Sequence, residues 1–192
     1  MKHRPRKKPD EFGGRLMREA ADPPRSINEL NSDLFALEED DRFANPVEAR
    51  KKAMDYLARR EYGRKELLQK LIKSGFELTI AEPAVLCLAE EGLQDDRRFV
   101  ENFVQSRVNQ GKGPQRIQAD LGQRGLAAGL VDEVLQDCNV DWYAMAREVR
   151  LKKFGLANPA DFKEKARQMR FLQARGFEQD HIQSAVSASD CD

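Results

Sequence analysis

A pattern of apolar residues around a glycine occurs three times along the chain. The glycines are Gly75, Gly125 and Gly176, so successive copies lie 50 and 51 residues apart. Each glycine has a leucine four residues before it and further apolar residues one and ten residues after it. These residues are Leu71, Phe76 and Val85 in the first copy, Leu121, Leu126 and Leu135 in the second, and Leu172, Phe177 and Val186 in the third. Such a period indicates tandem copies of one supersecondary unit.

The spacing around each glycine predicts a helix that ends there. A leucine one turn before the glycine is the last core-facing residue of that helix, and glycine adopts the left-handed conformation that ends it. The apolar residue after the glycine packs back against the helix. Each unit therefore contains a helix, a glycine stop and a further helix.

Apolar periodicity within the first unit predicts three short helices. One begins near Pro46, where the missing N–H of proline is tolerated. A second follows Gly63 and stops at Gly75, and a third starts near Pro83 and ends at Gly92. Because helices of about a dozen residues are marginal alone, each must bury its apolar stripe against its neighbours.

The other two units follow the same plan. Asp95 or Asp96 is expected to cap the first helix of the second unit, and Gly113-Pro114 starts its second helix. In the third unit, Asn158 is predicted as a cap and Pro159 as the first-turn residue of the second helix. The order of elements is therefore the same in all three units.

These elements predict an all-α fold of three tandem three-helix repeats that form an elongated, curved body. We place the repeats at residues 46–92, 93–140 and 141–188, after a mostly flexible N-terminal arm at residues 1–45. The arm has a basic start, an acidic end at residues 38–41 and no sustained apolar period. Its basic start is either a solvated terminus or a contact for phosphate or an acidic partner.

The composition of the 192 residues indicates a protein dominated by its surface. Charged residues make up 34%, aromatic residues 7%, and the mean hydropathy is −0.72. The 33 basic and 33 acidic residues balance, which argues against binding nucleic acid by net charge alone. The chain lacks the run of roughly 18 apolar residues that spans a membrane, and no hydrophobic segment follows its basic start. We therefore expect a soluble, cytoplasmic protein.

Residues suited to catalysis or metal binding are sparse. The three cysteines lack metal-binding spacing, which indicates a reduced setting, and two of them lie at apolar helical positions and are expected in the core. The histidines are His3 and His181, the latter expected at the surface or its boundary. The turn at residues 111–114 lacks the upstream glycine and the hydroxyl of a phosphate-binding loop. We predict no catalytic residue, no metal site, no cofactor and no enzymatic activity.

Basic residues are the strongest functional candidates. They gather around the turn at residues 111–114 and outnumber acidic residues between positions 147 and 175. They form either a solvated helix face or a contact stripe for acidic protein loops, nucleic acid or both. No aromatic residues alternate with them, so base stacking is not indicated. The candidate partner-binding residues are Arg98, Arg107, Lys112, Arg116, Arg124, Lys152, Lys153, Arg167 and Arg170.

Several stretches of the chain match a family signature. They are LAEEGLQDDRRF at 88–99, FVQSR at 103–107, GKGPQRI at 111–117, LGQRGL at 121–126, the pair Asp141-Trp142, and RFLQARGF at 170–177. In these stretches the chain resembles the RecX family, bacterial regulators of the RecA recombinase. The resemblance covers roughly residues 47–187, and it implies a fold of three tandem three-helix repeats.

The resemblance also implies a function. It predicts a non-enzymatic modulator, with inhibition as the expected direction, that binds along the RecA filament on single-stranded DNA. Strand exchange, ATP hydrolysis and repressor cleavage, in DNA repair and the SOS response, are the activities it would alter. Two alternatives stay open: a general nucleic-acid-binding helical protein that acts on recombination indirectly, and a structural adaptor with another partner. We expect the filament as partner, a weak direct contact with DNA, no membrane contact and a monomeric chain.

Overall fold

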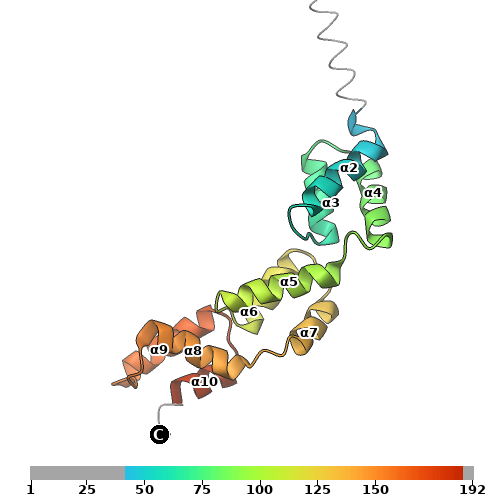
Figure 1. The fold of residues 1–192 in the computed structure, drawn as a ribbon. Helices are drawn as coiled ribbons and strands as arrows, with labels where there is room; N and C mark the ends of the chain where they lie inside the picture. Colours follow the sequence, from blue (N-terminus) through green and yellow to red (C-terminus); the bar gives the residue numbers. More distant parts are fainter. Residues whose placement is uncertain (1–41, 188–192) are drawn as a thin grey trace, which may run out of the picture. The chain divides into compact units, whose positions relative to one another are not determined.

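The computed structural model describes residues 42–187, which form nine α-helices and no strand (Figure 1). Repeat 1 consists of α2 (Pro46–Leu57), α3 (Arg64–Lys73) and α4 (Leu78–Glu90). Repeat 2 consists of α5 (Asp96–Asn109), α6 (Pro114–Gln123) and α7 (Ala128–Asp137). Repeat 3 consists of α8 (Trp142–Phe154), α9 (Phe162–Ala174) and α10 (Gln179–Ser187). The all-α fold of three three-helix repeats is confirmed.

Two parts of the fold prediction extend beyond this description. The N-terminal arm expected at residues 1–45 lies outside the described residues, except for residues 42–45. Within those four positions, Phe43 packs against the core of repeat 1 and stands edge-on to Phe76, with 5.4 Å between the ring centroids. The elongated, curved outline stays a prediction.

Among residues 42–187, no helix has both the length and the apolar character needed to cross a membrane.

The three glycines end helices as predicted. Gly75, Gly125 and Gly176 have φ angles of +104°, +79° and +87°. In each copy the residue after the glycine donates its N–H to the carbonyl of the preceding leucine: Phe76 to Leu71 (3.2 Å), Leu126 to Leu121 (3.3 Å) and Phe177 to Leu172 (3.3 Å). This is the hydrogen bond of a Schellman motif, and both apolar residues of each pair are buried. The repeated spacing in the sequence therefore encodes a repeated helix closure.

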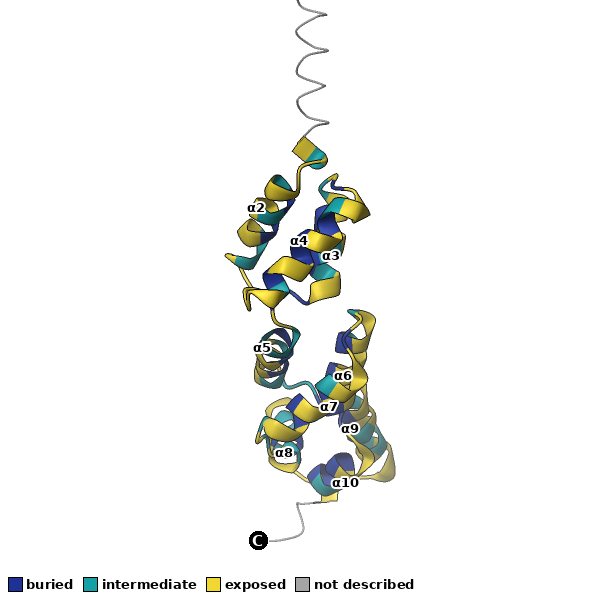
Figure 2. Cartoon of the chain, turned by 90° about the vertical axis from the view of Figure 1, so that its right-hand side faces the viewer, coloured by how far each residue is buried: buried dark blue, intermediate teal, exposed yellow. Residues whose placement is uncertain are grey.

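Each repeat buries a core of its own. Leu67 and Leu88 lie at the centre of the first core, Ile117 at the centre of the second, and Leu172 and Phe177 at the centre of the third. Figure 2 shows the buried residues on the faces that helices of one repeat turn toward one another. Partly buried Val108 and Trp142 pack against both the second and the third core. Separate cores leave the outer helix faces open to solvent.

Two helix starts differ from prediction, and both involve proline. α4 begins at Leu78, so Pro83 lies inside the helix and not at its start. The helix loses one backbone hydrogen bond at Pro83, and it keeps its course because its apolar stripe, which includes Val85, is buried in the core. α9 begins at Phe162 and not at Asn158-Pro159, because the Asp161 carboxylate accepts the Glu164 N–H at 2.7 Å and caps the helix there.

Two side chains are buried differently from expectation. Cys87 is exposed because it lies outside the buried stripe of α4, and its Sγ donates to Glu91 Oε1 at 3.2 Å. His181 is buried, with 7% of its surface exposed. Its Nδ1 accepts the Glu178 N–H at 3.3 Å, and its ring stands edge-on to Tyr143 at 4.7 Å. His181 therefore helps to begin α10 and to pack it against α8.

Candidate functional site

Repeats 1 and 2 meet where α3 and α5 begin. The Arg64 N–H, at the start of α3, donates to Asp96 Oδ1 at 2.7 Å. Buried Gln94 donates from its side-chain amide to the same oxygen at 2.8 Å and to the Tyr62 carbonyl at 3.2 Å. The expected cap of α5 is Asp95, which accepts the Arg97 N–H at 2.7 Å. Asp96 is thereby free to satisfy a helix start in the neighbouring repeat.

Ion pairs flank this junction and involve two of the predicted cations. Arg124 lies 3.0 Å from Glu66 on α3, which Arg60 also contacts at 2.7 Å. Arg98 lies 2.6 Å from Glu61 and donates to the Leu93 carbonyl at 3.0 Å. The hydrogen bond to Glu61 raises the pKa of the Arg98 guanidinium above its ordinary value. Arg98 and Arg124 therefore join repeat 1 to repeat 2.

Repeats 2 and 3 meet through the backbone of the turn at residues 111–114. The Gly113 N–H donates to the Arg175 carbonyl at 2.9 Å, and the Gln115 N–H donates to the Gly176 carbonyl at 3.1 Å. Arg175 in turn donates from Nη1 to the Gln110 carbonyl at 3.1 Å. The turn around which the predicted cations gather is thus occupied by the glycine stop of the next repeat.

The remaining predicted cations differ in their contacts. Same-helix carboxylates pair with three of them: Arg116 with Asp120 (3.0 Å), Lys152 with Glu148 (2.6 Å) and Arg167 with Glu164 (3.4 Å). Arg107 lies 3.7 Å from Asp120, and Arg107 and Arg124 both lie over the Phe103 ring, at 4.6 and 5.2 Å from its centroid. Within residues 42–187, Lys112, Lys153 and Arg170 form no ion pair. Ion pairs between exposed side chains, such as Lys152 with Glu148, contribute about 0–1 kcal/mol to stability.

The structure gathers some of these cations into separate hollows. Lys152 and Lys153 line a hollow of about 280 Å³ together with Val149, Phe171 and Arg175. Arg124 lines a different one, on α3. Among the described residues, no three His, Cys, Asp or Glu side chains converge where a metal ion could bind.

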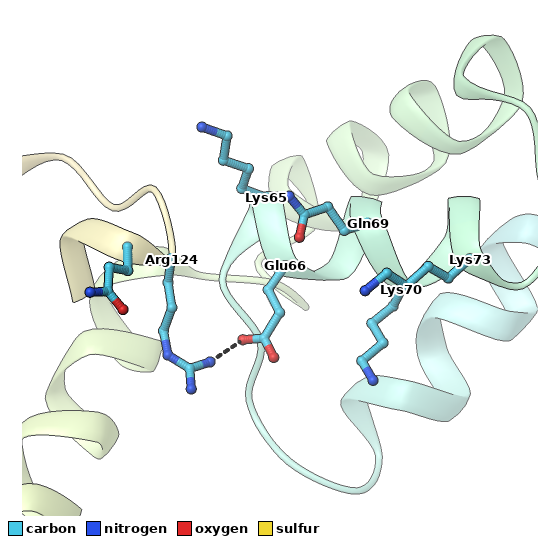
Figure 3. Close-up of a pocket in the computed structure, with 7 residues that line it drawn as sticks. Lys65, Glu66, Gln69, Lys70, Lys73 and Arg124 are labelled. Atoms are coloured by element: carbon cyan, nitrogen blue, oxygen red, sulfur yellow. Dashed lines mark hydrogen bonds and ion pairs between the residues drawn. The ribbon is translucent and has the colours of Figure 1, made fainter. Parts of the chain in front are cut away.

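A basic groove follows α3 at the junction of repeats 1 and 2 (Figure 3). Its volume is about 300 Å³, and we call it the α3 groove. It is lined by Lys65, Glu66, Gln69, Lys70, Lys73, Gln123 and Arg124. Four cations thus face one carboxylate, and a concave surface of one predominant charge attracts ions of the opposite charge.

Three lysines of this groove are absent from the sequence prediction. Lys65, Lys70 and Lys73 lie in repeat 1, whereas the predicted cations come from repeats 2 and 3. A usable signal was present, because polar residues at helical spacing continue along one face of α3 opposite Leu67 and Leu71. Sequence alone could not place Arg124 at the edge of this face, since it arrives from the turn after α6.

Known proteins similar to this chain share its repeat structure. Models of the first, second and third three-helix domains of RecX match residues 49–86, 95–135 and 139–186. Regulatory protein RecX of Halorhodospira halophila is 51% identical over 140 residues, which cover 73% of this chain and 87% of the relative. The same-named protein of Ectopseudomonas mendocina is 47% identical over 138 residues, which cover 72% and 92%.

Solved structures give the same comparison at the level of the fold. A crystal structure of regulatory protein RecX has a TM-score of 0.65 at 18% identity and covers 85% of this chain and 79% of its own. RecX from Lactobacillus salivarius has the same TM-score and identity, with coverage of 76% and 96%. At this level of identity the likeness concerns the fold alone.

Proposed function

The chain belongs to the RecX family of regulatory proteins, and on that premise we propose that it modulates the RecA recombinase by binding along the RecA filament on single-stranded DNA. The proposed effect is inhibition of strand exchange, ATP hydrolysis and repressor cleavage in DNA repair and the SOS response. The chain acts in the cytoplasm as a monomer and contributes no catalytic step of its own.

The observation that carries this proposal is the series of three similarly built repeats, each with its own core. A filament presents the same sites at every subunit. A chain with three similar units can therefore contact neighbouring subunits together, and the high effective concentration of the second contact raises avidity by about 10²- to 10⁴-fold. Modest individual contacts then suffice for stable binding.

Charged groups for such contacts are present on the outer faces of the repeats. Lys153 and Arg170 are exposed and form no ion pair within residues 42–187. They can bind acidic groups of a partner without breaking an internal contact. Arg98 and Arg124 are less suitable, because both are engaged at the junction of repeats 1 and 2.

Binding of this kind can inhibit in two ways. The bound chain can block access of duplex DNA or of a repressor, or it can hold RecA subunits in one arrangement. The second route requires different affinities for the active and inactive filament, because a ligand shifts an equilibrium only by that difference.

Purified protein added to preformed RecA filaments tests the proposal. ATP hydrolysis and strand exchange are measured together, and both are expected to fall. The double reversal Lys153→Glu/Arg170→Glu should weaken this inhibition, whereas Lys51→Glu, at an exposed position on α2, serves as the control. No change in either activity on addition of the wild-type protein would contradict the proposed function.

A general nucleic-acid-binding protein is the second candidate, and the α3 groove is the observation that favours it. The two candidates differ in affinity for bare and RecA-coated DNA. If bare single-stranded DNA binds as tightly as the filament, with a steep salt dependence, the second candidate replaces the first.

A further inference from the structure

The α3 groove is lined by polar side chains from helix α3 and from the C-terminal end of α6. Lys65, Lys70 and Lys73 lie on the outer face of α3, while Leu67 and Leu71 on its other face are fully buried. Figure 3 shows the Arg124 side chain reaching toward α3 from the neighbouring repeat. Packing of the leucines therefore fixes which residues of α3 line the groove.

The lysines of the groove keep their charge available, whereas its carboxylate does not. Within residues 42–187, Lys65, Lys70 and Lys73 form no ion pair. Glu66 contacts Arg60 at 2.7 Å and Arg124 at 3.0 Å, and its side chain is 17% exposed. Because Glu66 is occupied by two arginines, the three ammonium groups remain uncompensated at the surface.

This set of donors suits phosphate. An ammonium group is a compact point charge that binds phosphate oxygens in many orientations, whereas a guanidinium binds a phosphate or a carboxylate through a rigid, bidentate fork. The guanidinium in the lining, that of Arg124, is already held by Glu66. Gln69 and Gln123 add neutral amide groups that can donate to further oxygens.

The length of the groove favours a chain of phosphates over a single one. From Lys65 to Lys73, α3 advances about 12 Å at 1.5 Å per residue. The lining contains no aromatic side chain on which a base could stack. Contact with such a polymer would therefore be made through its backbone and would be independent of base sequence.

Repeat 2 carries no such set of cations at the corresponding place. The residues of α6 that correspond to the groove residues of α3 are Gln115, Arg116, Ala119, Asp120 and Gln123. The one cation of this set, Arg116, is paired with Asp120 at 3.0 Å. The excess of positive charge on α3 is thus not shared by the corresponding helix of repeat 2.

We propose that the α3 groove is a binding site for the phosphodiester backbone of nucleic acid, with Lys65, Lys70 and Lys73 as its cations. The site deepens the proposed function and rests on it for its setting, because the proposed partner is assembled on a DNA strand. Glu66 limits affinity because it holds the guanidinium groups of Arg60 and Arg124. Removal of its charge releases both groups and therefore strengthens binding.

Fluorescence anisotropy with a labelled single-stranded oligothymidylate tests the site in the full-length chain. The variant Lys70→Gln/Lys73→Gln removes two groove cations. The matched control Lys51→Gln/Lys52→Gln removes two lysines from α2 of the same repeat, where Glu48 and Asp55 lie close by. Glu66→Gln removes the counter-charge and leaves every lysine in place.

The affinity for the oligonucleotide is expected to fall in Lys70→Gln/Lys73→Gln and to rise in Glu66→Gln. With a slope of about 0.7 per cation for single strands, loss of two cations lowers the slope of log K against log salt by about 1.4. The same relation weakens binding by roughly 25-fold at about 0.1 M salt. The control pair should leave both quantities nearly unchanged, and Glu66→Gln should tighten binding severalfold.

Several results would overturn the site. They are an unchanged salt slope in Lys70→Gln/Lys73→Gln, equal weakening in the control pair, or weaker binding in Glu66→Gln. If binding of polyglutamate depends on the two lysines and binding of oligothymidylate does not, the groove binds carboxylates instead.

The site and the proposed function fail separately. A chain that binds oligothymidylate through the groove without affecting RecA retains the site and loses the proposed function. A chain that inhibits RecA but binds no oligothymidylate loses the site alone.

Discussion

The Arg64 N–H donates to the Asp96 carboxylate at 2.7 Å, so a residue of repeat 2 caps a helix of repeat 1. The N-cap of α3 is Gly63, which has no side chain to accept this hydrogen. At the corresponding place in repeat 2, α6 begins with Pro114, which has no N–H, and Trp142 stands where Asp96 would. The neighbouring repeat thus supplies a hydrogen-bond acceptor to the Arg64 N–H. It supplies none at Pro114, which has no N–H to donate.

Replacement of Asp96 by alanine should destabilise the junction of repeats 1 and 2. Loss of a cap costs about 0.5–2 kcal/mol, and Gln94 loses an acceptor as well. We expect the free energy of unfolding, measured by urea titration, to fall by about 1–2 kcal/mol. Asp96→Asn retains an oxygen acceptor and should lose less.

The control for this loss is Asp55→Ala, at an exposed position on α2. Surface substitutions of this kind usually stay within about 0.5 kcal/mol. An equal loss at Asp55, or none at Asp96, would contradict the cap.

Alanine at Gly113 should loosen the docking of repeat 3. Its φ of −79° suits any residue, so the cost is steric: an added Cβ would lie 2.4 Å from backbone atoms of Gly176. Overpacking of this kind costs about 1–3 kcal/mol, which urea unfolding would measure.

Gly122→Ala provides the matched comparison within the same region. An added Cβ there meets nothing within 4 Å, and Gly122 lies inside α6. Alanine should therefore stabilise α6 by up to about 1 kcal/mol. Effects of the same sign at Gly113 and Gly122 would argue against the close approach.

The Cys87 thiol should react slowly with alkylating reagents. Its hydrogen bond to the Glu91 carboxylate raises its pKa above the ordinary value, so less thiolate is present at a given pH. In a chain whose other cysteines are replaced by serine, Glu91→Gln should lower this pKa and speed alkylation by iodoacetamide severalfold at about pH 8. Mass spectrometry against time gives the rate.

The neighbouring Glu90→Gln removes the same charge and should speed this alkylation much less, because Glu90 contributes least to the raised pKa. Equal alkylation rates in the Glu90 and Glu91 variants would show that the hydrogen bond to Glu91 is not what slows the reaction of Cys87.

Arg150 should stabilise repeat 3 although it bears a charge in the interior. It is 3% exposed, and it donates to Gln168 Oε1 at 2.9 Å and to the Ala157 carbonyl at 2.8 Å. Arg150→Ala leaves the buried Gln168 oxygen without this donor and should cost about 2 kcal/mol or more. Exposed Arg170→Ala, on α9, should cost less than about 0.5 kcal/mol. Thermal unfolding of the two variants compares them, and equal midpoints would contradict the role of Arg150.

The sequence determined the repeat and its helix closures, because the residues involved are neighbours along the chain. Leu71, Gly75 and Phe76 lie within two turns of one another, so their spacing alone specifies a Schellman motif. The wrong starts at Pro83 and Asn158 have a different cause. At Pro83 burial against the core outweighed a local preference, and after Asn158 a competing cap at Asp161 set the start of α9.

Only the tertiary structure decided how the repeats meet and which cations share a surface. Arg64 and Asp96 are 32 positions apart, and Glu66 and Arg124 are 58 apart. No periodicity reports contacts at such separations, because they depend on how the backbone of one repeat docks on the next. The sequence therefore does not distinguish a cation that joins two repeats, such as Arg98, from one that is exposed to solvent, such as Lys70.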